Sequence, residues 1–133
     1  MATQEMRSVY VETLIALAER DERIMVCEAD LMRAHGTTKF ADRFPGRAVD
    51  VGVAEANLVG VSAGLSLGGK IPFAATFGCF ASRRAFDQFF LSANYARLNV
   101  KLVGTDPGVT AAFNGGTHMP FEDVGLMRMV PGL

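Results

Sequence analysis

The feature that most constrains the fold is a regular alternation of short apolar runs with longer segments of helical character. Four runs have the length and apolar content of buried strands, namely "RIMVC" (23–27), "AVDV" (48–51), "IPFAA" (71–75) and "VKLVG" (100–104). We expect helices over 7–20, 55–67, 84–98 and 120–130. Strands that alternate with helices predict a parallel sheet covered by helices on both faces. The expected fold is therefore α/β, a three-layer α/β/α sandwich with a mostly parallel sheet.

Two other stretches and a pair of glycines carry structural expectations. The segment 38–47 contains Pro45 and Gly46 and is expected to be a polar loop. A loop of about 15 residues follows the fourth strand, and loops of that length in a compact domain are usually functional or disordered. Gly60 and Gly64 each cost a helix about 1 kcal/mol, so we expect them to let another backbone approach closely.

Composition limits the classes of partner. The chain has 133 residues, enough for one domain, and 13 basic against 14 acidic residues give a net charge of −1. Without a basic block, a nucleic-acid partner is not expected, and no apolar run is long enough to span a membrane. Cys27 and Cys79 have no CxxC spacing, which favours free thiols in a cytoplasmic protein over a disulfide or a zinc site. The apolar fraction of 50% predicts a subunit interface and dimerisation.

Ligands of open parallel sheets bind at the carboxyl ends of the strands. Four segments meet there in the expected layout: 30–31, 52–55, 76–80 and 105–118. Glu55 is the one acid in a run of small and apolar residues, at the start of the second helix. It could merely complement the helix dipole, but its apolar surroundings solvate a charge poorly. We therefore expect Glu55 to have a partner or to be protonated.

Three more side chains near the strand ends have two interpretations each. Phe77 and Phe80 could be core side chains beneath a loop, or they could form a stacking surface for a flat ring. His118, in a glycine-rich stretch, could cap the following helix or contact a ligand. The stretch "SLGGK" (66–70) lacks the spacing of a phosphate-binding loop, and no nucleophile elbow is present.

Taken together, four stretches resemble the pyrimidine-binding domain of transketolase. They are "VGVAEANLVGVSAGLSLGG", "PFAATFGCF", "RAFDQ" and "GGTHMPFEDVGLMRMVP", in the same order and with near-identical spacing. The resemblance implies a thiamine-diphosphate-binding fold. It also implies that residues 1–133 form one such domain that is incomplete at its carboxyl end, where further strands and a C-terminal domain are expected to follow.

The resemblance assigns cofactor roles to five residues. Glu55 matches the glutamate that bonds a pyrimidine ring nitrogen and favours the imino tautomer, which then deprotonates the thiazolium carbon. Phe77 and Phe80 match the aromatic pair that packs against the pyrimidine, and Asp30 and Leu31 match an "ADL" segment near the cofactor. A carboxyl group that shares its proton must be sequestered, so we predict an interface that excludes water around Glu55.

The substrate side follows the family less closely. Arg7 falls at an arginine that binds the substrate phosphate, and His118 matches a histidine near the reacting carbons of the donor sugar. Ala34 lies at a phosphate-contacting serine, Asp106 replaces a substrate histidine, and Asn114 replaces an acid that reads a substrate hydroxyl. These departures leave cofactor activation intact but change the local charge unfavourably for an ordinary sugar phosphate, so an unusual ketose, such as a branched one, is possible.

The diphosphate-binding motif of the family is absent from the sequence. The resemblance therefore implies a partner subunit that binds the diphosphate and Mg²⁺ or Ca²⁺, with no metal ligand in this chain, in a homodimer or heterotetramer. The expected reaction is transfer of a two-carbon ketol unit between sugar phosphates. The alternatives are an activity like that of 1-deoxy-D-xylulose-5-phosphate synthase, which would consume pyruvate, and a non-catalytic assembly subunit.

Overall fold

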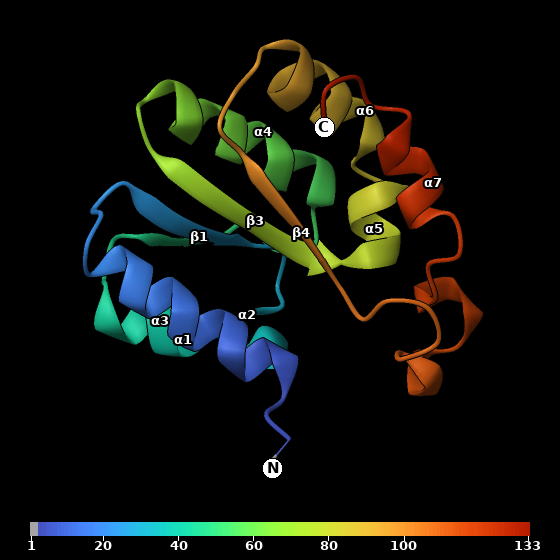
Figure 1. Cartoon of the computed structure of the whole chain (residues 1–133), viewed down its shortest axis with the longest axis horizontal. Helices are drawn as coiled ribbons and strands as arrows, with labels where there is room; N and C mark the ends of the chain where they lie inside the picture. Colours follow the sequence, from blue (N-terminus) through green and yellow to red (C-terminus); the bar gives the residue numbers. More distant parts are fainter. Residues whose placement is uncertain (1–2) are drawn as a thin grey trace.

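The computed structural model describes residues 3–133 and confirms the three-layer α/β/α architecture (Figure 1). In this part of the chain the sheet has four strands, β1 (Ile24–Glu28), β2 (Ala48–Asp50), β3 (Ile71–Phe77) and β4 (Lys101–Thr105). All neighbouring strands pair in parallel, in the order β2-β1-β3-β4. Each strand lies within two residues of its predicted bounds, because the apolar runs are the buried strands.

One face of the sheet is covered by α1 (Met6–Ala18) and α3 (Thr38–Arg43) (Figure 1). The core there joins Leu14 of α1, Val26 of β1 and Phe40 of α3, all 2% exposed or less. The segment 38–47 was predicted to be a polar loop, and that prediction is wrong for residues 38–43, which form α3, while residues 44–47 form the predicted loop. Phe40 is fully buried against the sheet, and Phe44, just past the end of α3, packs on it with the ring centres 5.1 Å apart. The burial of Phe40 stabilises a helix that the polar residues around it do not predict.

The other face is covered by α4 (Glu55–Leu67), which begins and ends where predicted. Leu58 of α4 packs against Cys27 of β1 and Ala74 of β3. Neighbouring residues of a strand point to opposite faces, so Val26 and Cys27 serve the two different cores.

The remaining elements refine the predicted helices. The segment 84–98 is a short helix, α6 (Phe86–Gln88), that continues into a π-helical segment, η1 (Phe89–Tyr95), in place of one regular α-helix. The others are α2 (Met32–His35), α5 (Gly78–Ser82), η2 (Ala112–Asn114), η3 (Gly116–His118) and α7 (Asp123–Arg128). The wider π-helical turn directs Phe89 and Ala93 toward Val59 of α4, where all three are buried.

Within the described residues of this chain, no other backbone approaches Gly60 or Gly64 closely. A Cβ atom at either glycine would meet no described residue within 4 Å. At Gly104 of β4, by contrast, a Cβ atom would lie 3.0 Å from the Cα of Gly78, where α5 begins. These two glycines bring α5 against β4, and α5 carries part of the candidate site.

Within residues 3–133, the structure contains no helix with the length and apolar character needed to cross a membrane. Cys27 and Cys79 are both free and buried.

Candidate functional site

The carboxyl ends of the parallel strands meet at one edge of the sheet, as expected. The strand order reverses between β1 and β3, and a crevice for ligands opens at such a switch point. The Asp50 carboxylate ties this edge together, because its Oδ1 accepts hydrogen bonds from the backbone N–H groups of Asp30 and Gly52, each at 2.9 Å. It therefore joins the end of β1 to the turn that leads into Glu55.

Glu55 is the first residue of α4 and is 2% exposed within this single chain. Its Oε2 accepts a hydrogen bond of 2.8 Å from Nη1 of Arg84. The expected partner of the buried acid is therefore an arginine from the turn between α5 and α6. Arg84 belongs to the "RAFDQ" stretch, which contributed to the family resemblance, but the sequence alone assigned it no role.

Phe77, Phe80 and His118 form one aromatic cluster. The rings of Phe77 and Phe80 lie 6.0 Å apart at 78°, and His118 meets them edge-on at 5.3 and 5.1 Å. The guanidinium carbon of Arg84 lies 4.5 Å from the centre of the Phe80 ring. Arg84 thus links the aromatic cluster to the carboxylate of Glu55, and the side chains for which the sequence left two interpretations open are brought together.

A buried polar network beside this cluster was not predicted. His35 Nδ1 lies 2.8 Å from Oε2 of Glu28, and Oε1 of Glu28 accepts a 2.7 Å hydrogen bond from the Thr37 hydroxyl. His35 Nε2 lies 2.9 Å from the Thr105 hydroxyl at the end of β4, and its ring faces Phe77 at 6.4 Å. Glu28, His35 and Thr37 are each 2% exposed or less. The only signal in the sequence was an acid at the end of an apolar strand.

The charge of Glu28 influences its neighbours. Burial raises the pKa of the Tyr10 hydroxyl far above its ordinary value, and the nearby Glu28 raises it further. Burial likewise raises the pKa of the Cys27 thiol, with a smaller effect from Glu28. Burial also raises the pKa of Cys79. Neither thiol is therefore suited to act as a nucleophile at neutral pH.

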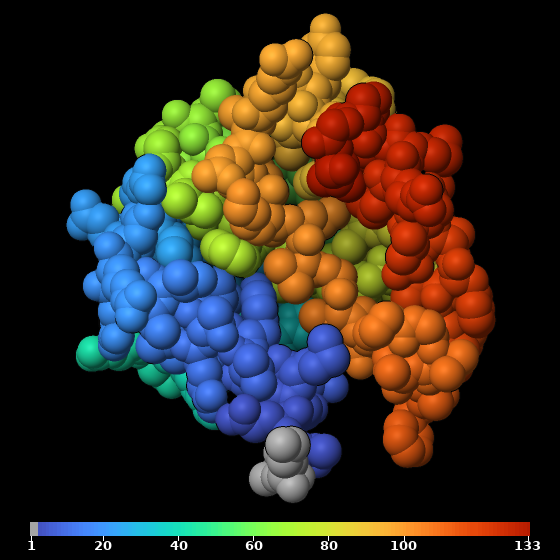
Figure 2. Space-filling model, in the orientation of Figure 1, coloured from blue at the N-terminus to red at the C-terminus, as the bar shows by residue number. Residues whose placement is uncertain are grey.

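Two of the proposed substrate residues, Arg7 and Asp106, lie where the amino-terminal end of α1 meets the segment after β4 (Figure 2). Arg7 lies 3.8 Å from Asp106 and donates a 2.9 Å hydrogen bond to the carbonyl of Ala34. A cavity of about 300 Å³ at this place is lined by three basic residues, Arg7, Arg33 and Lys39, and by one acid, Glu5, which pairs with Nε of Arg7 at 2.8 Å. The basic side chains outnumber the acid, and this excess of positive charge suits an anionic group.

The other candidates are less closely joined. Asp30 is exposed at the end of β1, with a φ angle of 61°, and Leu31 beside it is partly buried. Asn114 is exposed in η2, and none of the described side-chain hydrogen bonds connects it to the cluster. Among the residues 3–133, no group of three or more His, Cys, Asp or Glu side chains could hold a metal ion.

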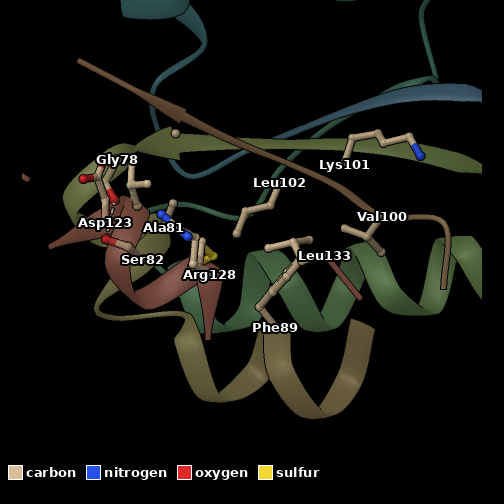
Figure 3. A pocket seen from close by; sticks show the side chains of 13 residues that line it. Gly78, Ala81, Ser82, Phe89, Val100, Lys101, Leu102, Asp123, Arg128 and Leu133 are labelled. Atoms are coloured by element: carbon tan, nitrogen blue, oxygen red, sulfur yellow. Dashed lines mark hydrogen bonds between the residues drawn. The ribbon is translucent and has the colours of Figure 1, made fainter. Parts of the chain in front are cut away.

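Glu55 lines none of the described grooves of the molecule. One groove of about 660 Å³ lies between β4, α5 and α7, and the side chains of Phe89, Leu102 and Leu133 line it (Figure 3). It contains none of the candidate residues. In this chain the candidate site is a surface at the sheet edge and not an enclosed pocket.

Comparisons with known proteins agree with this geometry. The family model of the transketolase pyrimidine-binding domain matches residues 2–133. The chain is 56% identical over 128 residues to a 6-deoxy-6-sulfo-D-fructose transketolase subunit of Clostridium sp. (strain MSTE9), covering 96% of this chain and 40% of that protein. It is 36% identical to 1-deoxy-D-xylulose-5-phosphate synthase of Leifsonia xyli, covering 94% of this chain and 19% of the relative. A solved split-gene transketolase, an inactive beta4 tetramer, superposes with a TM-score of 0.81 at 44% identity, covering 94% and 40% of the two chains. The chain thus spans well under half the length of these relatives.

Proposed function

Because the chain belongs to the family of transketolase pyrimidine-binding domains, we propose that it supplies the pyrimidine side of a thiamine-diphosphate site in a split transketolase. The proposed reaction is transfer of a two-carbon ketol unit between sugars. The observation that carries the proposal is Glu55, a carboxylate that is almost fully buried at the sheet's ligand-binding edge beside the aromatic cluster of Phe77, Phe80 and His118.

The residues of the crevice fit an aminopyrimidine. Oε1 of Glu55 makes none of the described hydrogen bonds, so it is the oxygen available to a ring nitrogen. Phe77 and Phe80 offer an apolar surface for a flat ring. When bound, thiamine diphosphate supplies the carbanion chemistry of ketol transfer. In our proposal this chain orients the pyrimidine, keeps water away from Glu55 and presents Oε1 to the ring nitrogen.

On the substrate side we propose a ketose with an anionic terminal group. The support is the position of Arg7, Arg33 and Lys39 around one cavity, beside Asp106. The 56% identical relative is a transketolase subunit for 6-deoxy-6-sulfo-D-fructose, which makes a sulfonate a specific candidate for that group. His118, beside the two phenylalanines, is proposed to face the reacting carbons of the donor. Asp30, Leu31 and Asn114 are proposed to line the same crevice.

The proposed partner is a diphosphate-binding subunit that carries Mg²⁺ or Ca²⁺, in a homodimer or heterotetramer. Several large apolar side chains are exposed, which supports a surface that binds a partner. They include Val53, two residues before α4, and Phe113 and Phe121, in and after the segment that contains η2 and η3. We further propose a cytoplasmic location, because both cysteines are free.

The test mixes this chain with the partner subunit and measures heat on titration with thiamine diphosphate and Mg²⁺. We expect binding with both chains and none with either alone. Glu55→Gln should abolish exchange of the thiazolium proton, whereas Glu12→Gln, an exposed residue of α1, should leave it unchanged. Wild-type exchange in the Glu55→Gln protein would overturn the proposal. Heat from the paired subunits separates the enzyme from the non-catalytic assembly subunit.

The second candidate function is a synthase of 1-deoxy-D-xylulose-5-phosphate type, favoured by the 36% identical relative. The two reactions differ in their donor. Consumption of a ketose with no consumption of pyruvate would support the transketolase, and comparing 6-deoxy-6-sulfo-D-fructose with fructose 6-phosphate as donors would test the sulfonate.

A further inference from the structure

Arg84 touches both kinds of side chain that the proposed function places on the pyrimidine. Its Nη1 donates to Oε2 of Glu55 at 2.8 Å, and its guanidinium carbon lies 4.5 Å from the centre of the Phe80 ring. The Glu55 side chain is 3% exposed, while the Arg84 side chain is 51% exposed. The arginine therefore reaches from the exposed surface at the sheet edge to the buried carboxylate.

The neighbouring arginine has a different role. Arg83 Nε pairs with Oε1 of Glu122 at 2.6 Å, at the start of α7, and Arg83 also donates to the carbonyl of Met119 at 3.4 Å. Its side chain is 44% exposed, similar to that of Arg84. Two adjacent residues of the same type and similar exposure thus serve two different carboxylates, and only Arg84 contacts the crevice.

The two oxygens of the Glu55 carboxylate have different surroundings. Oε2 is held by Arg84, and Oε1 makes none of the described hydrogen bonds. A buried carboxylate that loses its donor is strongly disfavoured, and an arginine is a planar donor that fixes the orientation of the group it bonds. The stacking on Phe80 in turn limits where the guanidinium can move.

We propose that Arg84 is a positioning residue for the cofactor, an inference that rests on the proposed function. It holds Oε2 of Glu55 so that Oε1 points at the pyrimidine nitrogen, and it supports Phe80 as the wall against which the ring packs. The opposite arrangement would be an arginine that occupies the pyrimidine position and must leave before the cofactor binds. The two arrangements predict opposite effects of removing Arg84 on cofactor affinity.

The experiment measures the dissociation constant of thiamine diphosphate, with Mg²⁺ present, for complexes of the partner subunit with variants of this chain. Arg84→Met should weaken binding by about ten- to a hundredfold, the range for one hydrogen bond to a charged group. Arg84→Lys keeps the charge but lacks the planar fork, so it should restore part of the loss. Arg83→Met, the matched control, should stay within about twofold of the wild type.

A double-mutant cycle ties the effect to Glu55. In a Glu55→Gln background, adding Arg84→Met should weaken binding far less than in the wild type, because the two residues act as one unit. Tighter binding by Arg84→Met, or an equal loss in both backgrounds, would overturn the inference. If the wild-type complex binds no thiamine diphosphate at all, the proposed function is wrong, and the role inferred for Arg84, which rests on it, is wrong as well. Circular-dichroism melting of each variant confirms that the chain is folded.

Discussion

The buried network of Glu28, His35 and Thr37 makes a quantitative prediction about the stability of the site. The Thr37 hydroxyl donates a 2.7 Å hydrogen bond to Oε1 of Glu28, and both residues are fully buried. Thr37→Val keeps the shape of the side chain and leaves no cavity, but it removes this donor. A hydrogen bond to a charged group is worth about 1.5–3 kcal/mol, so the free energy of unfolding should fall by about 2 kcal/mol.

The measurement is urea unfolding followed by circular dichroism. With a slope of about 1–3 kcal/mol per M for a small domain, the loss should lower the midpoint by about 1 M. The matched control is Thr38→Val, one residue along, whose hydroxyl makes none of the described hydrogen bonds and which should change stability by less than about 0.5 kcal/mol. Equal midpoints for the two variants would refute the prediction that the hydrogen bond from Thr37 to Glu28 stabilises the fold.

The remaining predictions concern glycines and a surface ion pair. Gly104→Ala puts a Cβ atom 3.0 Å from the Cα of Gly78, so the free energy of unfolding, measured with urea, should fall by about 1–3 kcal/mol. In Gly60→Ala the new Cβ atom has nothing within 4 Å, so the free energy of unfolding should rise by up to about 1 kcal/mol. A hydrogen bond from Arg23 lowers the pKa of Asp21 to about 2 from 3.8, so its contribution to stability is fully present above pH 3.8 and is lost as the pH falls through about 2. In Arg23→Gln, carbon NMR should show the pKa of Asp21 rising toward 3.8, and an unchanged pKa would contradict the assignment.

The strands and α4 could be predicted because the apolar residues that each of them buries are contiguous or regularly spaced in the sequence. The helix α3 could not, because Phe40 is the one buried residue within Thr38–Arg43, and Phe44, at helical spacing from it, is followed at once by Pro45 and Gly46, which indicate a loop. The role of Arg84 was equally inaccessible. An arginine is ordinarily a surface residue, and its pairing with Glu55, 29 positions away, exists only after α4 and the turn before α6 have met.

His35 shows why the buried polar network beside the site could not be predicted from the sequence. Histidine in a polar stretch has no periodicity, yet here it joins the carboxyl end of β1, through Glu28, to the end of β4, through Thr105. The strand order places β3 between β1 and β4, so a histidine that joins these two strands stands beside Phe77 at the end of β3. The sequence alone does not give this order.

The burial of Glu55 within the single chain changes the expected role of a partner. The sequence suggested that an interface would exclude water from this carboxylate, but it is already only 2% exposed, with Arg84 as its counter-charge. The free energy cost of burying the acid therefore arises when the chain folds and does not oppose assembly. The proposed partner would need only to cover a surface whose carboxylate and aromatic rings are already in position, and a site organised in advance loses less entropy when its ligand binds. The proposed division between two subunits is consistent with this arrangement, because Glu55 and the arginine that bonds it come from one chain alone.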